Sequence, residues 1–361
     1  MATECDDAGA AAQHVVSLSA AFMVSAALHA AASLDVATHL RAGPRSAAQL
    51  AAACGADADA LHRVLRLLAA QGVFRLTPPR TYELNAAARC LLPGEAGSVH
   101  AAVRWLADEF HFNVFGAQGG MMHSLRTGEP AVASAVGAPI VEHLATHPAL
   151  ARSFNAAMSE FSEGVMRSGA LESLDLSAGV DVVADIGGGH GAVLAAVLRA
   201  HPALRGVLFE LPEVASGAGA ALAREGVADR ATIVAGNFFA EGAAMPRADA
   251  YIMKHIIHDW DDARARHILR AVRDAMQPPL AAKRLLLLER VLPADDDVAG
   301  AGGEAARFTH VIDMEMLVVA GGRERTEAEF AALLRSAGLA LARIARTRTQ
   351  LCVIEARPDA A

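Results

Sequence analysis

Residues 254–262, KHIIHDWDD, bring two histidines, three aspartates, a lysine and a tryptophan into nine positions. Such a segment could bind a metal ion, form a solvated run of charges or carry the catalytic groups of an enzyme. A metal site needs three or four converging ligands. The segment contains neither an H-x-x-x-H nor an H-E-x-x-H pattern. We therefore expect no metal site.

His258 lies where a predicted strand ends and a predicted helix approaches. Ligands bind at this edge of open α/β sheets, and a histidine there can accept a proton near neutral pH. Asp261 and Asp262 instead suit the start of the helix, where acids stabilise the helix dipole. Two later acids, Glu289 and Glu324, could reach His258, fix its tautomer and stabilise its charged form.

A glycine turn, DIGGGHG at residues 185–191, follows another predicted strand. Glycines there let the backbone approach a ligand closely at the positive end of a helix. Glu210 closes the next predicted strand, where an acid would accept hydrogen bonds from the ribose of an adenine nucleoside. Asn237 and Phe238 follow the third strand and could contact adenine. These features favour an adenosine-containing ligand and leave NAD and S-adenosylmethionine both open.

Strands and helices alternate after residue 177, which predicts a doubly wound α/β domain. Residues 46–83 predict a helix-turn-helix followed by a short hairpin, or wing, containing Pro78-Pro79. Such a unit could bind DNA or mediate dimerisation. Its second helix offers only three basic side chains on a largely apolar surface, His62, Arg63 and Arg66. This favours dimerisation over a winged-helix regulator that binds DNA.

Length and charge restrict the remaining possibilities. A chain of 361 residues is long enough for two domains, which we place at residues 1–100 and 101–361, the second including linker helices. The net charge of −8 disfavours nucleic acid as a partner. Four scattered cysteines and an acidic N-terminus suit the cytoplasm. The apolar stretch at residues 20–37 contains polar residues, so we expect a buried helix and no membrane association.

Six segments in order carry a resemblance to a known family: DIGGGHG, FELPEV, GNFF, ADAYIMKHIIHDWDD, LLLLERVLP and GGRERTEAEFAALLRSAG. The chain resembles, over nearly its whole length, the S-adenosylmethionine-dependent small-molecule O-methyltransferases of the caffeate methyltransferase type. Bacterial members act on polyketides, phenazines and other aromatic metabolites. The resemblance implies a Rossmann-like methyltransferase domain, an N-terminal winged-helix domain that forms a homodimer, S-adenosyl-L-methionine as cofactor, and a small aromatic substrate bearing a hydroxyl group.

The resemblance also implies roles for individual residues. His258 would be the general base that deprotonates the acceptor hydroxyl, flanked by Glu289 and Glu324 and supported by Asp259. Cofactor contacts would come from Gly187, Glu210, Leu211, Asn237, Phe238, Lys254, Ser162 and Trp260. Substrate contacts would come from Met158, Met316, Asp313, His111, Phe112 and Asn113.

Two positions depart from the family pattern, which usually has aspartate at both Glu210 and Asn237. The longer acid should still bind ribose, and the amide keeps hydrogen bonding to adenine while removing a charge. Relatives on this fold also include C-methyltransferases, hydroxylases and pericyclic catalysts. The combination of His258, Glu289 and Glu324 favours methylation of oxygen over these alternatives.

Overall fold

The structure, a computed structural model, describes residues 2–116, 120–176, 179–240, 245–294 and 303–359. The chain forms two compact units, each described here by itself. One comprises Met1–Gly116 and Val141–Phe161, and the other comprises Ala117–Ile140 and Ser162–Ala361. The units are thus interleaved along the chain, whereas the sequence suggested a single boundary at residue 100.

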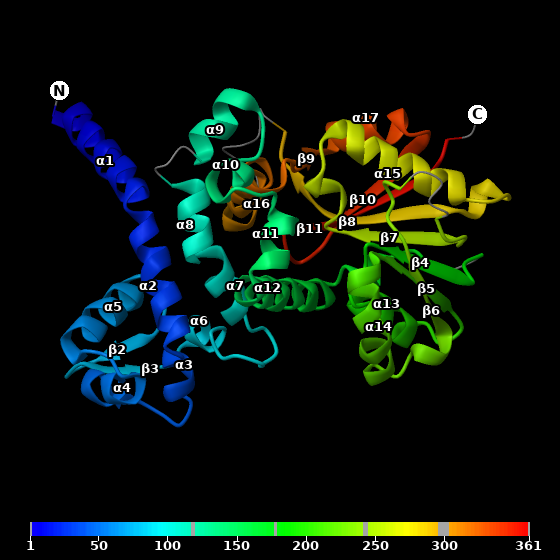
Figure 1. Cartoon of the computed structure of the whole chain (residues 1–361). Coiled ribbons are helices and arrows are strands. Elements are labelled where there is room, and N and C mark those ends of the chain that lie inside the picture. Colours follow the sequence, from blue (N-terminus) through cyan, green and yellow to red (C-terminus); the bar gives the residue numbers. More distant parts are fainter. Residues whose placement is uncertain (1, 117–119, 177–178, 241–244, 295–302, 360–361) are drawn as a thin grey trace. The chain divides into compact units, whose positions relative to one another are not determined.

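The first unit contains the predicted helix-turn-helix and wing (Figure 1). Helix α4 (Ala47–Cys54) begins at Ser46, whose hydroxyl accepts from the Gln49 amide, and ends at Gly55, whose φ of 68° suits a glycine. Helix α5 (Ala58–Ala70) is capped by Asp57. Strands β1 (Arg45–Ser46), β3 (Thr81–Glu83) and β2 (Arg75–Thr77) form the small sheet in that order. The winged-helix prediction is confirmed.

One polar residue of α5 lies in the core of this unit. The His62 ring is buried, and its Nδ1 atom lies 2.8 Å from the Tyr82 hydroxyl, which also donates to the His62 carbonyl oxygen. His62 was one of three basic side chains that could have faced a DNA groove. Only Arg63 and Arg66 remain for that purpose on this helix.

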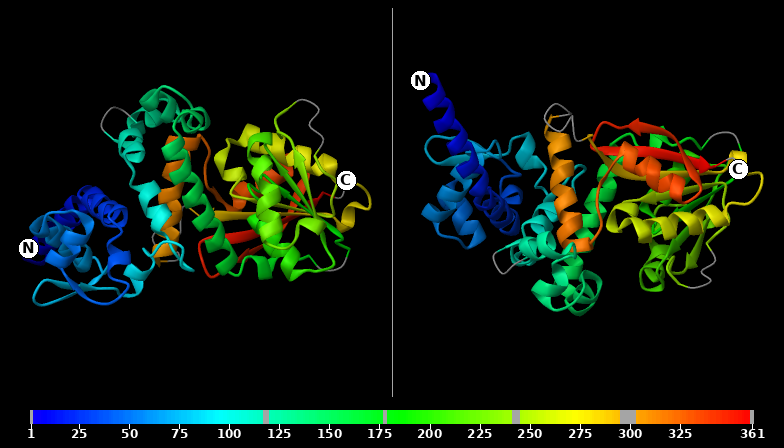
Figure 2. Two further views of the ribbon diagram at one scale, coloured as in Figure 1. Left: turned by 60° about the horizontal axis from the view of Figure 1, so that its bottom comes forward. Right: turned by 90° about the horizontal axis from the view of Figure 1, so that it is seen from above.

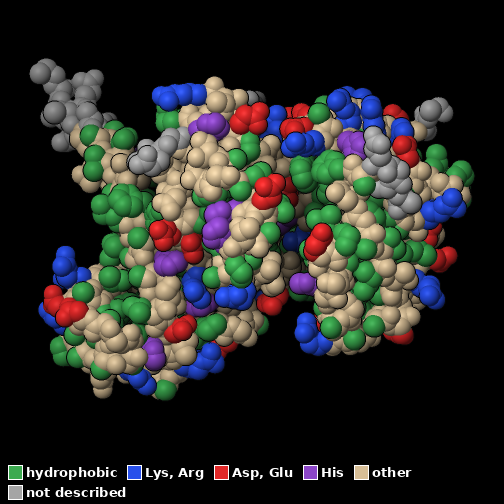
Figure 3. Space-filling model, viewed as in Figure 1, with side chains coloured by type: hydrophobic (Ala, Val, Ile, Leu, Met, Phe, Trp, Pro, Cys, Tyr) green, Lys and Arg blue, Asp and Glu red, His purple; other side chains and the backbone are tan. Residues whose placement is uncertain are grey.

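The N-terminal helices correct one prediction. Residues 20–37 were expected to be buried, but α1 (Ala2–Ser19) and the start of α2 (Ala21–Ser33) expose most of their large apolar side chains, Val15, Val16, Leu18, Phe22 and Met23. Figure 3 shows hydrophobic side chains along these helices. The reason is that α2 packs through the small side chains of Ala27, Ala31 and Ala32 in its second half, whereas the bulky residues lie on α1 and in the first turn of α2, ahead of this packed region.

Within the described residues, Gly9–Ser33 is long and apolar enough to cross a membrane, judged by length and composition alone, and 17% of its most apolar window is buried. Core helices of soluble proteins and signal sequences meet the same criterion. The remaining helices of this unit are α3 (Val36–His39), α6 (Ala86–Arg89), α7 (His100–Leu106), α8 (Glu109–Phe115), α11 (Ile140–Thr146) and most of α12 (Pro148–Arg167).

The second unit is built on one large sheet with the strand order β10-β11-β8-β7-β4-β5-β6. Five strands are parallel, namely β4 (Val182–Ile186), β5 (Arg205–Glu210), β6 (Ala231–Ala235), β7 (Ala250–Lys254) and β8 (Arg284–Leu292). The hairpin of β10 (Leu339–Arg346) and β11 (Leu351–Pro358) extends the sheet antiparallel to β8. The central strand β4 lies where the strand order reverses, the usual position of ligand sites in such folds.

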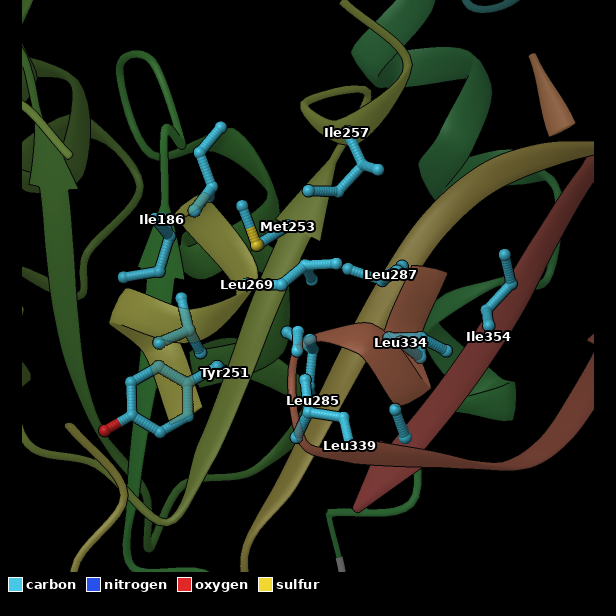
Figure 4. Packing of buried hydrophobic residues seen from close by; sticks show 14 of the residues in the cluster. Ile186, Tyr251, Met253, Ile257, Leu269, Leu285, Leu287, Leu334, Leu339 and Ile354 are labelled. Atoms are coloured by element: carbon cyan, nitrogen blue, oxygen red, sulfur yellow. The ribbon is translucent and has the colours of Figure 1, made fainter. Parts of the chain in front are cut away.

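Helices cover both faces of this sheet, as Figures 1 and 2 show. On one face α13 (Ala192–Ala200) and α14 (Pro212–Arg224) bury residues such as Leu194 and Leu222. On the other face α15 (Asp262–Ala275) and α17 (Glu327–Ser336) pack against the strands, with Leu269, Leu287 and Leu334 among the buried contacts in Figure 4. The doubly wound α/β prediction is therefore confirmed.

Several short elements pack near the carboxyl end of β8. They are α9 (Gly120–Thr127), α10 (Val132–Val136), α16 (Gly303–Glu315), the π-helix η6 (Met316–Ala320) and strand β9 (Arg325–Thr326), which pairs with β8. The backbone N–H of Ala131 donates to the Val318 carbonyl oxygen at 2.8 Å and ties the loop before α10 to η6. These elements place Asp313, Met316 and Glu324 beyond the end of the sheet.

Candidate active site

The site is formed where β7 ends. The strand stops at Lys254, and a single 3-10 turn, η3 (Ile257–Asp259), carries His258 before α15 begins. Asp261 caps that helix by accepting from the Arg264 amide at 2.9 Å, as the sequence indicated. His258 is buried, with 6% of its surface exposed. An ionisable ring in such a position needs polar partners.

Three carboxylates surround the His258 ring. Its Nδ1 atom lies 3.0 Å from Glu324 Oε1 and 3.7 Å from Glu289 Oε2, while its Nε2 atom lies 3.4 Å from Asp259 Oδ1. The structure therefore brings together all four residues proposed as catalytic. The short contact at Nδ1 is a hydrogen bond, and it favours the tautomer that carries the proton on Nδ1.

Glu289 positions the turn that carries His258. Its Oε1 atom accepts hydrogen bonds from the backbone amides of Ile256 and Ile257, at 3.0 and 2.9 Å. The residue is fully buried inside β8, whose strand continues to Leu292. Because one oxygen is engaged by the backbone, the other is left to face the imidazole.

The segment before β9 is held against the same turn. The Glu324 amide donates to Asp313 Oδ1, and the Arg323 amide donates to the His258 carbonyl oxygen, both at 2.8 Å. Gly322 makes this approach possible, because a Cβ atom there would lie 1.9 Å from the His258 carbonyl oxygen and 2.6 Å from the Trp260 nitrogen. The sequence analysis assigned no role to this glycine.

A buried arginine fixes the turn from the other side. Arg325 is 1% exposed and donates to the carbonyl oxygens of Ile257 and Trp260 and to the Asp262 carboxylate, at 3.1, 2.9 and 2.8 Å. Asp262 thus does more than begin a helix. Sequence reasoning missed Arg325, since an arginine beside Glu324 in GGRERT is indistinguishable by pattern from a solvated one.

The electrostatics of the cluster favour a charged imidazole. Burial alone would lower the pKa of His258, but Glu289, Asp259 and Glu324 outweigh it and raise the pKa to about 9. Burial also raises the pKa of the Glu289 carboxyl. The site can thus accept a proton on His258 and stabilise the resulting imidazolium.

The glycine turn after β4 forms a close-packed cradle. A Cβ at Gly187 would lie 2.6 Å from the Ile256 side chain, and one at Gly188 would lie 2.4 Å from the Asp185 carboxylate. Glu210 braces the turn, since its carboxylate accepts from the amides of Gly189 and Leu211 at 2.8 and 2.7 Å. A carboxylate can accept about four hydrogen bonds, so capacity for ribose hydroxyls remains.

Two opposite charges lie beside this cradle. Asp185 is fully buried, and its carboxylate oxygens have no hydrogen-bond partner among the described residues. Burial raises the pKa of Asp185 to about 7, against the attraction of Lys254, whose own pKa burial lowers. An unsatisfied carboxylate at the switch point of the sheet suits a site completed by a polar ligand.

Aromatic side chains adjoin the end of β6. The Phe239 ring lies edge-on to both Phe238 and Trp260, with centroids 4.8 and 4.7 Å apart. The Asn237 Oδ1 atom accepts from the Phe239 amide at 2.8 Å, which directs its oxygen toward the backbone. The departure from aspartate therefore leaves an amide NH₂ donor where the family usually has a second carboxylate oxygen.

The proposed substrate and remaining cofactor residues divide between the two units. His111, Phe112, Asn113 and Met158 belong to the first unit, where the His111 ring lies edge-on to Trp105. Asp313, Met316 and Ser162 belong to the second, with Met316 buried at the start of the π-helix and Ser162 partly buried on α12. The structure describes these two groups separately.

The catalytic cluster also has the geometry of a possible metal centre. One ligand atom from each of His258, Glu289 and Glu324 lies within 4.8 Å of the others. The expectation that no metal binds here stays a prediction.

Comparisons with known proteins match this arrangement. An O-methyltransferase dimerisation domain matches residues 16–94, and an O-methyltransferase domain matches residues 121–340. Phenazine O-methyltransferase PhzM of Lysobacter antibioticus is 37% identical over 93% of both chains. The solved structure of the mitomycin 7-O-methyltransferase MmcR has a TM-score of 0.83 at 36% identity, over 98% of this chain and 99% of that one.

Another relative carries a different activity in its name. Aclacinomycin 10-hydroxylase RdmB of Streptomyces purpurascens is 36% identical over 88% of this chain and 81% of its own length. Solved neighbours of the same fold contain S-adenosylmethionine or S-adenosylhomocysteine. With both domain matches in order along one chain, the protein belongs to the S-adenosylmethionine-dependent O-methyltransferases of bacterial natural-product biosynthesis.

Proposed function

We propose that the enzyme methylates a hydroxyl group of an aromatic metabolite, with His258 as the general base. The observation that supports this most directly is the contact between His258 Nδ1 and Glu324 Oε1 at 3.0 Å. In the neutral form of the ring that bond keeps the proton on Nδ1, so the lone pair of Nε2 can take the proton of the substrate hydroxyl. The neighbouring carboxylates of Glu289 and Asp259 then stabilise the imidazolium.

The cofactor supplies a methyl group that its sulfonium already activates for transfer. The chain's own task is to orient the acceptor, exclude water and remove its proton. A phenol has a pKa of about 10 and is mostly protonated at neutral pH. A positioned histidine adds roughly 10²- to 10⁴-fold in rate to such a transfer. The Nε2 atom of His258 would take the hydroxyl proton as the oxygen becomes the nucleophile.

The residues of the cradle suit S-adenosyl-L-methionine. Gly187 keeps the turn free of side-chain bulk, the braced carboxylate of Glu210 can accept ribose hydroxyls, and the unsatisfied Asp185 offers an acceptor at the strand end. Adenine would contact Asn237, Phe238 and Leu211. Lys254, Ser162 and Trp260 complete the proposed cofactor residues.

Further observations support an aromatic substrate and a homodimer. The named relatives act on phenazine and mitomycin compounds, and one solved neighbour holds a hydroxynaphthoic acid beside S-adenosylmethionine. In this proposal Met158, Met316, Asp313, His111, Phe112 and Asn113 confine the acceptor. The matched dimerisation domain and the exposed apolar side chains of α1 and α2 support a homodimer. A soluble enzyme in the cytoplasm, acting without nucleic acid or membrane, completes the proposal.

Substitution of His258 tests the assigned base. His258→Ala should abolish methyl transfer while isothermal titration still detects S-adenosylmethionine binding, and His201→Ala at the end of α13 serves as a matched histidine control. A panel of phenols and hydroxyquinones with methyl-labelled cofactor would identify the product by mass spectrometry. Unchanged turnover in His258→Ala would disprove the role of the base.

A second candidate reaction is hydroxylation, or methylation of carbon, on the same fold. The observation that favours it is the named hydroxylase at 36% identity. In the labelling experiment, a product carrying label on carbon, or one that gains oxygen and no methyl group, would select these alternatives over O-methylation.

A further inference from the structure

Arg290 is a buried cation beside the proposed base that the proposed mechanism has not used. It follows Glu289 on β8 and is 9% exposed. Its Nη1 atom lies 3.4 Å from His255 Nε2 and 3.7 Å from Glu324 Oε1. One nitrogen of a single guanidinium thus approaches both a second histidine and the carboxylate that holds His258.

The contact with Arg290 defines the state of His255. A guanidinium has only donors, so His255 Nε2 must be the acceptor and the ring must be neutral with its proton on Nδ1. Burial, Lys254 and Arg290 together hold the pKa of His255 well below its usual range. The ring therefore stays uncharged when His258 gains a proton.

His255 is also stacked on the proposed base. The two imidazole rings lie 5.0 Å apart between centroids and 19° from parallel. The backbone at His255 has a φ of 53°, in the left-handed region that non-glycine residues seldom adopt. This backbone conformation turns the chain as it leaves β7, so that the rings of His255 and His258 can face one another.

One oxygen of Glu324 lies beside both His258 and Arg290. Its Oε1 atom accepts from His258 Nδ1 at 3.0 Å and also lies 3.7 Å from Arg290 Nη1. Arg290 therefore competes with His258 for the same carboxylate oxygen. It thereby weakens the hold of that carboxylate on the imidazolium.

We propose that Arg290 is a positioning residue that sets the two stacked histidines in different protonation states, one a neutral spacer and the other a usable base. The proposal rests on the role proposed above for His258. The charged or titratable groups facing His258 are Lys254, His255 and Asp259 around the end of β7, Glu289 and Arg290 on β8, and Glu324 before β9, with Asp313 of α16 behind Glu324.

The charges around His258 determine how the loss of Arg290 would change its pKa. Three carboxylates face His258 and favour its protonated form, which cannot act as a base. Removing Arg290 would leave them less compensated, so His258 would bind its proton more tightly. The acidic limb of the pH profile of kcat would then move to higher pH, by about one unit, because Arg290 and His258 share one oxygen of Glu324.

Two substitutions at Arg290 test the proposal in the full-length enzyme. Arg290→Met removes the charge but keeps an unbranched side chain, and Arg290→Lys retains the charge. We expect Arg290→Met to lose about tenfold in kcat at pH 7 and to recover toward the parent value at pH 10, with the KM for S-adenosylmethionine unchanged. In Arg290→Lys the acidic limb of the pH profile of kcat should stay close to its pH in the unmodified enzyme. A loss that is uniform across pH in both variants would overturn the proposal.

A measurement that does not need turnover separates this proposal from the assignment of the base. Histidine labelled with ¹³C reports the pKa of His258 by NMR, with the His258→Ala variant identifying the signal. Arg290→Met should raise that pKa and Arg290→Lys should restore it, whether or not His258 proves to be the base. An unchanged His258 pKa in folded Arg290→Met protein would refute the proposal, whereas full activity of His258→Ala would refute only the proposed function.

Discussion

His258 and Glu324 are 66 positions apart in the sequence, yet His258 Nδ1 lies 3.0 Å from Glu324 Oε1. The contact is held at both ends by backbone hydrogen bonds, since the Arg323 amide donates to the His258 carbonyl oxygen and the Glu324 amide donates to Asp313. His258 and Glu324 therefore form one unit even though they come from separate elements.

Glu324→Gln should lower kcat by about 10²-fold while the KM for S-adenosylmethionine stays constant, because the amide keeps the size of the side chain but not its charge. Glu324 raises the pKa of His258, so its loss should lower that pKa. As the proposed base, His258 must be unprotonated, so the acidic limb of the pH profile of kcat should move to lower pH. A limb that moves upward would contradict this account of the cluster.

Glu210→Gln should weaken S-adenosylmethionine binding by roughly tenfold or more, since a charged acceptor is worth about 1.5 to 3 kcal/mol in hydrogen bonds. Isothermal titration would measure the affinity, with kcat retained at saturating cofactor. Glu213→Gln, on the exposed first turn of α14, is the matched control. Equal affinities for the two variants would remove Glu210 from the cofactor site.

Gly322→Ala should destabilise the protein by more than about 2 kcal/mol, because the added Cβ meets the backbone around His258. Gly219→Ala on α14 is the control: its Cβ would lie 3.8 Å from the nearest atom, and alanine favours a helix over glycine by about 1 kcal/mol. Urea unfolding would show opposite signs for the two variants. Similar stabilities would show that the loop relaxes to accept a side chain.

Phe22→Arg should convert the proposed dimer to a monomer. The Phe22 side chain is 55% exposed in the single chain and lies inside the matched dimerisation domain, so a charge there should prevent burial against a second copy. Sedimentation would report the mass. Val141→Arg changes a more exposed apolar residue outside that domain and should leave the mass unaltered. A Phe22→Arg protein that remains dimeric would place the interface elsewhere.

Chelation tests the expectation that no metal takes part. Activity should survive dialysis against EDTA, because His258, Glu289 and Glu324 are proposed to act through protons. The three side-chain atoms are close enough to hold an ion, so the geometry also permits the opposite result, a loss of activity on chelation. Loss of activity that added Zn²⁺ restores would replace the general base with a metal centre.

Local signals in the sequence predicted much of this molecule. Asp261 was expected to start a helix and caps one, and Ser46 and Asp57 cap the two helices of the predicted helix-turn-helix, because a capping hydrogen bond spans only two or three residues. The position of His258 at the carboxyl edge of the sheet followed from its place after a predicted strand. The approach of Glu289 and Glu324 did not follow in the same way, because Glu289 lies inside β8 and Glu324 precedes β9.

Other features depend on contacts that no local pattern records. Arg290 and Arg325 look like the other arginines of the chain, and only the folded structure shows that they are buried against His255 and Ile257. The exposure of Phe22 was missed for a related reason. Periodicity shows that a helix is apolar, but it does not distinguish burial in its own core from burial in a second copy.

The π-helix η6 at Met316–Ala320 carries Met316, one of the residues proposed to contact the acceptor. A π-helix contains one residue more per turn than an α-helix, so deletion of a single residue there would rotate Met316 and its neighbours about the helix axis. Glu324 would keep its place, since Arg323 and Arg325 tie the following segment to the turn that carries His258. A change in η6 would therefore alter the side chains proposed to contact the acceptor while His258 and Glu324 keep their arrangement.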